Sequence, residues 1–274
     1  MMNNNVRIYR KNSTAGEMEG DTPIAKTHDR LSSASHSNTS WLAQSVLNGA
    51  PVSRTTLLVL LCGPIGACLF TIVYLIEGIT RSGYNAWQQP VSVLSLGPGG
   101  WVQQVNFIVF GVISLCTVPA MRQVLKGGLG AIWYPIIRVL SAFSFIMLGF
   151  FSQDPVSGYP PGASVLTTPT LHGMIHIIFS FVSFLALAAG SFVIARRFAR
   201  EPRWHGWALY SIINGLLAIV FIALYGILSA QHSQIAGVFE RLPGLVDTIW
   251  AIFLLIRLFR IQREAAGNQL PQRA

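Results

Sequence analysis

Two histidines, His172 and His176, stand four residues apart in an apolar stretch of this 274-residue chain. Residues at that spacing share one face of a helix, so both imidazoles could bind a single zinc ion. Asp154, a short way before them, could add a carboxylate ligand, and a zinc-bound water would then suit a metal-dependent hydrolase acting on a lipid. Alternatively, the histidines hydrogen-bond to neighbouring helices. We expect no cofactor and keep zinc as the alternative.

Further polar residues near the ends of the apolar stretches could contact a ligand. Together with the histidines they form the set Trp87, Gln88, Asp154, His172, His176, Asn214, Glu240 and Arg241. We predict that they line an outward-facing polar pocket that binds a lipid or small molecule for sensing or transport. No nucleophile elbow and no pair of catalytic carboxylates occurs, so we favour binding over catalysis.

Six apolar blocks must position these side chains. Charged residues make up 11% of the chain, against about 25% in soluble domains, and hydrophobic residues make up 52%. Each block is long enough to cross a bilayer core about 30 Å thick. We therefore predict an all-α bundle of six transmembrane helices whose main partner is the lipid bilayer, with spans at Leu57–Gly78, Val102–Met121, Ala131–Phe151, Leu171–Ala195, Trp207–Ser229 and Leu242–Arg260.

The basic residues predict the orientation of the helices. Of the 19 Lys and Arg residues, 16 lie at one end of the blocks and only Arg81 and Arg241 at the other. Because cytoplasmic loops carry the excess, both termini are predicted to be cytoplasmic. Arg138 lies inside a block and is expected to snorkel to the cytoplasmic surface. The net charge of +9 forms no basic stripe, which argues against a nucleic-acid partner.

The acidic residues of the last block need separate explanations. Glu240 is expected to open the last helix, where the helix dipole favours a carboxylate. Asp247 is expected about one turn inside the span, where an unpaired charge is costly.

The chain divides into four predicted parts. Residues 1–40 are polar and poor in aromatics, which predicts a disordered cytoplasmic tail. Residues 41–54 could form an interfacial segment, 55–262 form the six-helix domain, and 263–274 form a second cytoplasmic tail. The sequence does not specify an oligomeric state.

The loop between the first two blocks is expected to contain a short helix. Pro90 suits a helix start, and Gly97-Pro98-Gly99-Gly100 ends it. The helix is either an interfacial lid anchored by Trp87 and Trp101 or a re-entrant segment that lines a pocket, and the sequence leaves both open.

Several further motifs follow one another along the chain. They are Asn85-Ala86-Trp87-Gln88-Gln89-Pro90-Val91-Ser92-Val93-Leu94-Ser95-Leu96-Gly97, Asp154-Pro155, Leu171-His172-Gly173, Arg196-Arg197-Phe198, Trp204-His205-Gly206-Trp207 and Phe239-Glu240-Arg241. Together they resemble a bacterial membrane family known as domain of unknown function 998. The resemblance implies a six-helix protein, multi-pass in a bacterial plasma (inner) membrane, and supplies no activity. The spacing of His172 and His176 is also similar to that in the zinc hydrolases related to adiponectin receptors and alkaline ceramidases, but those have seven helices.

Overall fold

A computed structural model describes residues 46–48, 50–128, 130–164 and 166–267. The predicted tail at 1–40 lies outside the described residues, as do residues 41–45 and 49 of the predicted interfacial segment.

Six helices in this part of the chain are long and apolar enough to cross a membrane. They are α2 (Arg54–Thr80), α3 (Trp101–Val124), α4 (Trp133–Phe150), α5 (Leu171–Phe198), α6 (His205–Ala230) and α7 (Ala236–Gly267). Five of them contain one predicted span each, and α4 is slightly shorter than its predicted span, Ala131–Phe151. The described residues form no named strand. The prediction of an all-α six-helix bundle is therefore confirmed, and the chain is a polytopic membrane protein.

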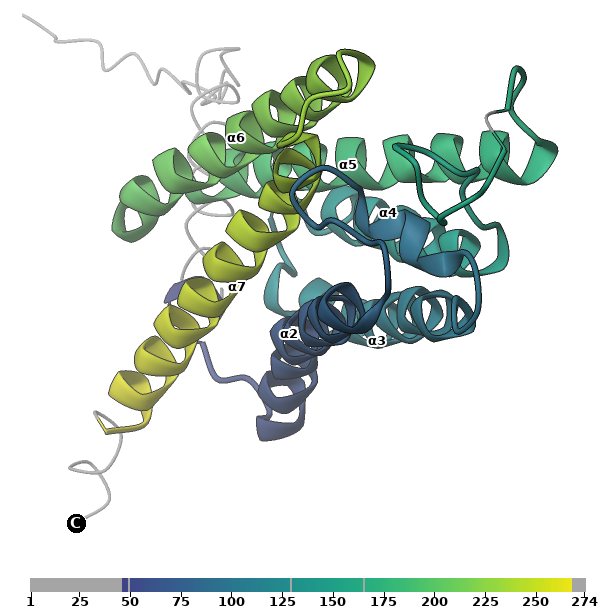
Figure 1. The fold of residues 1–274 in the computed structure, drawn as a ribbon. Helices are drawn as coiled ribbons and strands as arrows, with labels where there is room; N and C mark the ends of the chain where they lie inside the picture. The colour runs from purple at the N-terminus through teal and green to yellow at the C-terminus, as the bar shows by residue number, and fades with distance from the viewer. Residues whose placement is uncertain (1–45, 49, 129, 165, 268–274) are drawn as a thin grey trace, which may run out of the picture. The chain divides into compact units, whose positions relative to one another are not determined.

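The helices form a ring in chain order. Each packs against the next, and α7 also packs against α2, which closes the ring (Figure 1). α7 packs more extensively on α6 than on α2. The seam between α2 and α7 is thus the least tightly packed junction of the ring.

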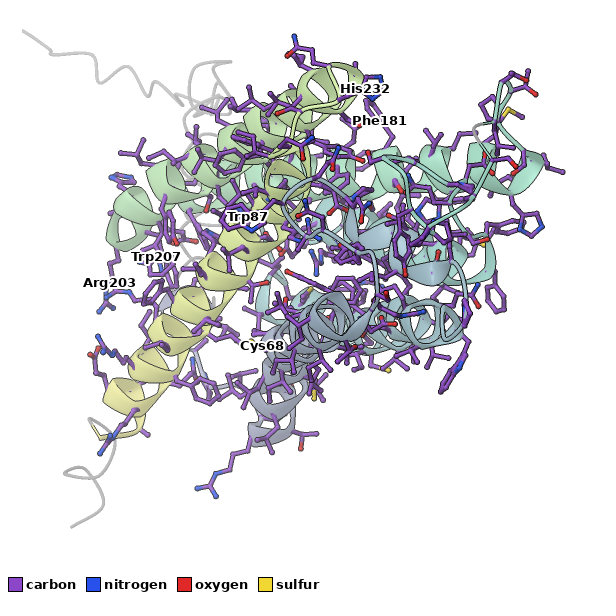
Figure 2. The ribbon with its side chains drawn as sticks, in the orientation of Figure 1. Cys68, Trp87, Phe181, Arg203, Trp207 and His232 are labelled. Atoms are coloured by element: carbon purple, nitrogen blue, oxygen red, sulfur yellow. The ribbon has the colours of Figure 1, made fainter. Side chains whose placement is uncertain are left out.

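The outer surface of the ring suits a hydrocarbon solvent. Large apolar side chains on the helices point outwards, such as Phe181 on α5, which is 59% exposed (Figure 2). Water would penalise so much exposed apolar surface, whereas lipid tails do not. This surface is the one expected to face the bilayer.

The last helix is longer than predicted at both ends. α7 begins at Ala236 rather than Leu242 and continues to Gly267, into the predicted C-terminal tail. Hydropathy places the start too late because Glu240 and Arg241 interrupt the apolar pattern although they lie within the helix. Glu240 is consequently one turn inside α7, and Asp247 lies deeper than the single turn that was expected.

One end of the ring is closed by the short 3-10 helices η1 (Val46–Asn48) and η3 (Pro202–Trp204). Leu47 and Trp204 are almost fully buried, and the Trp204 indole Nε1 donates a hydrogen bond of 2.8 Å to the Leu47 carbonyl. The Phe198 and Trp204 rings stack with centroids 4.8 Å apart. The middle of the predicted interfacial segment therefore packs into the core of the bundle.

The orientation predicted from the basic residues has a direct test. A reporter fused after Ala274, or inserted within residues 196–203, is expected to be cytoplasmic, and one within residues 157–162 is expected to be external. Accessibility to a membrane-impermeant reagent measures this. Reporters that lie on the same side of the membrane would contradict six spans with this orientation.

Candidate functional site: a charged cavity inside the ring

The ring encloses a cavity of about 160 Å³. Its walls come from α2, α3, α4, α5, α7 and the 3-10 helix η2 (Val91–Ser95). One part of the wall is aromatic, with Phe70, Phe107, Phe110, Phe145 and Phe184. Besides aliphatic residues, the rest of the lining contains the polar residues Tyr74, Ser92, Arg138, Ser141, Ser180, Ser183, Glu240, Arg241, Asp247 and Thr248.

Two of the charged residues form an ion pair across the cavity. An Arg138 Nη1 atom on α4 lies 3.9 Å from the Asp247 Oδ2 atom on α7, and both side chains are about four-fifths buried. The Asn214 amide on α6 donates to Asp247 Oδ1 (3.3 Å) and also to the Ser191 hydroxyl (3.0 Å). The expectation that Arg138 snorkels to the surface is wrong, because a carboxylate inside the ring compensates its charge.

The other two charged residues of the lining, Glu240 and Arg241, are adjacent on α7 and hold the loop that follows α2. Glu240 Oε2 accepts a hydrogen bond of 3.2 Å from the Val91 amide, at the start of η2. Arg241 donates to the Gln89 carbonyl (3.1 Å), to the Gly237 carbonyl and to the Tyr84 hydroxyl. Glu240 therefore stabilises the start of η2. The sequence had predicted that it would stabilise the start of its own helix.

This loop forms a plug in one end of the ring. Every residue of η2 is buried, Val93 and Leu94 completely, and Val91 and Ser92 line the cavity. Trp87 and Trp101, at the edges of the loop, are each 66% exposed (Trp87 in Figure 2). The geometry favours the re-entrant segment over the lid, since a lid resting on the surface would leave one face of η2 exposed.

Further contacts hold the plug in place. The Gln89 side chain donates to the Ser157 carbonyl (2.8 Å) and accepts from the Asn85 amide (2.8 Å). Arg81 pairs with Glu77 (3.0 Å) and donates to the Leu94 carbonyl (3.0 Å). The plug is thus tied to three separate parts of the chain: α2, the loop after α4, and α7.

Tyr84 is a hydrogen-bond donor within the plug. Burial raises the pKa of its hydroxyl above the ordinary value, and the nearby Arg241 opposes this shift only in part. The phenol is therefore protonated at neutral pH and donates to the Pro90 carbonyl (3.2 Å) while it accepts from Arg241.

A second cavity of about 80 Å³ adjoins the first. The two share Pro64, Met121, Tyr134, Trp250 and Ala251 as lining residues, so they lie side by side. The remaining lining of the second cavity is entirely apolar, with Leu47, Leu60, Val124, Leu125, Ile194, Phe198, Leu254, Leu255 and Leu258. The ring thus contains a cavity lined in part by charged residues beside a smaller cavity whose own lining is apolar.

The structure disperses the eight residues that the sequence proposed for a pocket. Glu240 and Arg241 line the cavity, and Asn214 reaches it through Asp247. Trp87 and Gln88 belong to the plug but do not line the cavity. Gln89, which follows Gln88 and which the sequence did not single out, is 4% exposed and makes the hydrogen bonds to Asn85 and Ser157.

Both histidines contact Phe151, but they meet different groups of that residue. His176 is 1% exposed, and its Nδ1 lies 2.6 Å from the Phe151 carbonyl. His172 is exposed, and its ring packs against the Phe151 ring with centroids 5.2 Å apart. Among the described residues no group of three or more His, Cys, Asp or Glu side chains could hold a metal ion. The expectation of no cofactor, with zinc as the alternative, stays a prediction, which metal analysis of the wild type beside a His176→Ala variant would test.

Asp154 caps the start of α5. Its carboxylate accepts from the Thr170 amide (2.8 Å) and the Thr170 hydroxyl (2.6 Å), and that hydroxyl accepts from the Gly173 amide (3.0 Å). Together these contacts satisfy amides that the first turn of a helix leaves unpaired.

An Asp154→Ala variant is expected to lower the free energy of unfolding by about 1 kcal/mol, because the Thr170 amide and hydroxyl lose their acceptor. Chemical denaturation in detergent measures the loss. Ser152→Ala is the control, since the described residues offer the Ser152 side chain no hydrogen bond. Equal stability of the two variants would contradict the capping role.

The sequence contained a signal for one of the missed cavity residues. An arginine inside an apolar span, as Arg138 is, by default indicates a function in the interior of a bundle. Ser180 and Ser183 continue the helix face of His172 and His176, and this polar stripe predicts that they point into the bundle, where both line the cavity. No local pattern indicated Tyr74 or Ser141, because serines and tyrosines are common in packed membrane helices.

Comparison with known proteins agrees with this architecture. The model of a family described as "Protein of unknown function (DUF998)" matches residues 64–257. The match contains the plug, the charged cavity and all or part of each of the six helices. No curated protein and no solved structure matches the chain. The chain belongs to the family of proteins of unknown function DUF998.

Proposed function

We propose that this protein binds one amphipathic molecule, with a polar head and an apolar tail, inside its ring of helices, in a plasma membrane and with both termini cytoplasmic. The observation that carries the proposal is the pairing of a charged cavity with an adjoining apolar one. A ligand with both characters is a lipid or a lipid-like metabolite.

The polar cavity suits a head group that carries both signs of charge. Two guanidinium groups and two carboxylates line it, so the lining has no net charge. The Nε atoms of Arg138 and Arg241 are buried and have no hydrogen-bond partner among the described residues. Because a buried donor without a partner is costly, these two atoms favour a ligand that brings acceptors.

The apolar parts suit a hydrocarbon chain. The phenylalanine wall and the adjoining leucine-rich cavity offer dispersion contacts but few hydrogen bonds. Small residues, Gly63 and Ala67 on α2 and Gly244 on α7, line the cavity beside the α2–α7 seam. This seam, the least tightly packed junction, is the natural entrance from the bilayer.

Binding can be tested with lysophosphatidylethanolamine, a zwitterionic single-chain lipid, added to the protein in detergent and counted by native mass spectrometry. Ser180→Leu fills part of the cavity and is expected to weaken retention of the probe about tenfold, equivalent to about 1.4 kcal/mol.

The matched control is Ile177→Phe, which adds volume to a neighbouring position of α5 that is 54% exposed. It should retain the probe as the wild type does. Thermal unfolding of each variant shows that the fold is kept. Equal retention by wild type and Ser180→Leu, or no retention by the wild type, would refute the proposal.

A further inference from the structure

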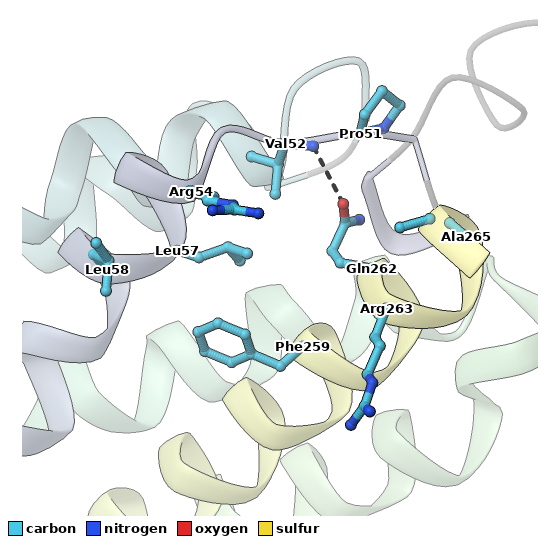
Figure 3. A pocket seen from close by; sticks show the side chains of 10 residues that line it. Pro51, Val52, Arg54, Leu57, Leu58, Phe259, Gln262, Arg263 and Ala265 are labelled. Carbon is cyan, nitrogen blue, oxygen red and sulfur yellow. Dashed lines mark hydrogen bonds between the residues drawn. The ribbon is translucent and has the colours of Figure 1, made fainter. Parts of the chain in front are cut away.

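A third cavity lies at the opposite end of the ring from the plug, between the start of α2 and the end of α7 (Figure 3). Its volume is about 500 Å³, within the range of small-molecule sites. The lining residues are Pro51, Val52, Arg54, Leu57, Leu58, Phe259, Gln262, Arg263, Ala265 and Ala266. The cavity shares no lining residue with the other two.

The shape of this cavity is maintained by hydrogen bonds between the segment before α2 and the end of α7. Gln262 accepts from the Val52 amide (3.2 Å, dashed in Figure 3) and donates to the Ala50 carbonyl (2.9 Å). Ser53 caps α2 by accepting from the Thr56 amide (3.0 Å). The Gln262 side chain therefore holds the two walls together through backbone groups of the segment before α2.

The charges of the lining are all positive. Arg54 contributes from the α2 wall and Arg263 from the α7 wall, and no acidic residue lines the cavity (Figure 3). Within the described part of the chain neither arginine forms a salt bridge. The start of α2 adds the partial positive charge of its helix dipole. An anionic ligand is therefore complementary to this end of the cavity.

The same cavity has an apolar side towards the bilayer. Leu58 is 61% exposed and Phe259 is 37% exposed, and both belong to membrane-spanning helices. A soluble anion would leave these side chains uncovered. A phospholipid would place its phosphate at the arginines and its acyl chain over Leu58 and Phe259.

We propose that this groove is a binding site for one anionic phospholipid, with the head group between Arg54 and Arg263. Guanidinium groups bind phosphate through paired hydrogen bonds, and basic pockets between helices on the cytoplasmic side suit anionic head groups. The positive charge of the bundle favours this end as cytoplasmic. The proposal is independent of the ligand proposed for the charged cavity.

The test uses the full chain in nanodiscs of phosphatidylcholine that contain one fifth phosphatidylglycerol, followed by release into detergent and native mass spectrometry. The wild type is expected to retain one phosphatidylglycerol. An Arg54→Gln/Arg263→Gln double variant should retain it about 20- to 30-fold less, since each basic residue near the membrane surface raises the affinity for an anionic lipid about fivefold.

The control is Arg203→Gln/Arg260→Gln, which removes the same charge from exposed residues at the same end but outside the groove (Arg203 in Figure 2). It should retain phosphatidylglycerol as the wild type does. Equal losses in both double variants would show only surface attraction and overturn the site. Retention by Arg54→Gln/Arg263→Gln, or displacement of the lipid by millimolar inorganic phosphate, would also overturn it.

Discussion

An Asp247→Ala variant is expected to lose about 3 kcal/mol of unfolding free energy, because it leaves the Arg138 charge inside the ring without its carboxylate. Asp247 also accepts from Asn214, whose amide loses a partner in the variant. Removal of one member of a buried pair costs more than removal of both, since an uncompensated charge is the main penalty. In a bilayer that penalty is not relieved by bulk water.

A double-mutant cycle measures the effect. The Arg138→Leu/Asp247→Ala double variant should recover much of the stability that Asp247→Ala loses, because no charge remains unpaired, and Arg138→Leu alone completes the cycle. Unfolding by a denaturing detergent from bicelles provides the free energies. If the single substitutions are additive, or if Asp247→Ala is as stable as the wild type, then the ion pair does not contribute to folding.

A Gly149→Ala variant is expected to lose about 2–3 kcal/mol, because α3 and α4 meet backbone to backbone at this position. A methyl group on Gly149 would lie 2.6 Å from the Gln104 carbonyl and 2.4 Å from an Ile108 side-chain carbon. Gly111 is the corresponding residue of α3, where an added methyl group would lie 2.7 Å from the Ala142 carbonyl. The backbone cannot move away without separating the two helices, so Gly111→Ala should behave similarly.

Gly226→Ala is the matched control for these glycines. Gly226 is also helical, in α6, and an added methyl group would meet nothing within 4 Å. The substitution should be neutral or stabilise by up to about 1 kcal/mol, since alanine is the better helix former. The three variants are compared by thermal unfolding in one detergent. A Gly149→Ala protein as stable as Gly226→Ala would contradict the close packing of α3 and α4.

The proposed ligand would contact the same two charged side chains that form the ion pair across the cavity. Arg138 and Asp247 compensate each other at 3.9 Å, a distance longer than a direct hydrogen bond. A head group with donors and acceptors could bind both without leaving either charge unpaired. A cavity that only stabilised the bundle would instead be expected to close around a shorter ion pair.

The plug explains why two charged residues occupy the start of α7. Glu240 and Arg241 bind backbone groups of the plug, the Val91 amide and the Gln89 carbonyl, that would otherwise lie unpaired inside the ring. Re-entrant backbone at membrane depth is tolerated only where protein satisfies its polar groups. Glu240 and Arg241 therefore hold the plug in place by hydrogen bonds, and they also line the cavity beside it.

The sequence by itself determined the number and approximate extent of the helices. Hydropathy is a local property, and a block of about 20 apolar residues must cross the bilayer wherever its neighbours lie. The predicted start of the fourth span, Leu171, is also the first residue of α5, because polar residues immediately before it separate this apolar block from the preceding one. The extent of α7 was underestimated, since its first turns carry charges whose partners lie elsewhere in the chain.

Only the tertiary structure decided which polar residues meet. Asp247 needed a partner by its depth, but whether Arg138 reached it or turned to the surface depended on how α4 and α7 are rotated within the ring. The burial of η2 likewise depended on the space left between the ends of six helices. His172 and His176 share a face by spacing, yet His176 is buried against the Phe151 carbonyl whereas His172 is exposed and packs on the Phe151 ring. Periodicity specifies the face of a helix, and only packing specifies what that face contacts.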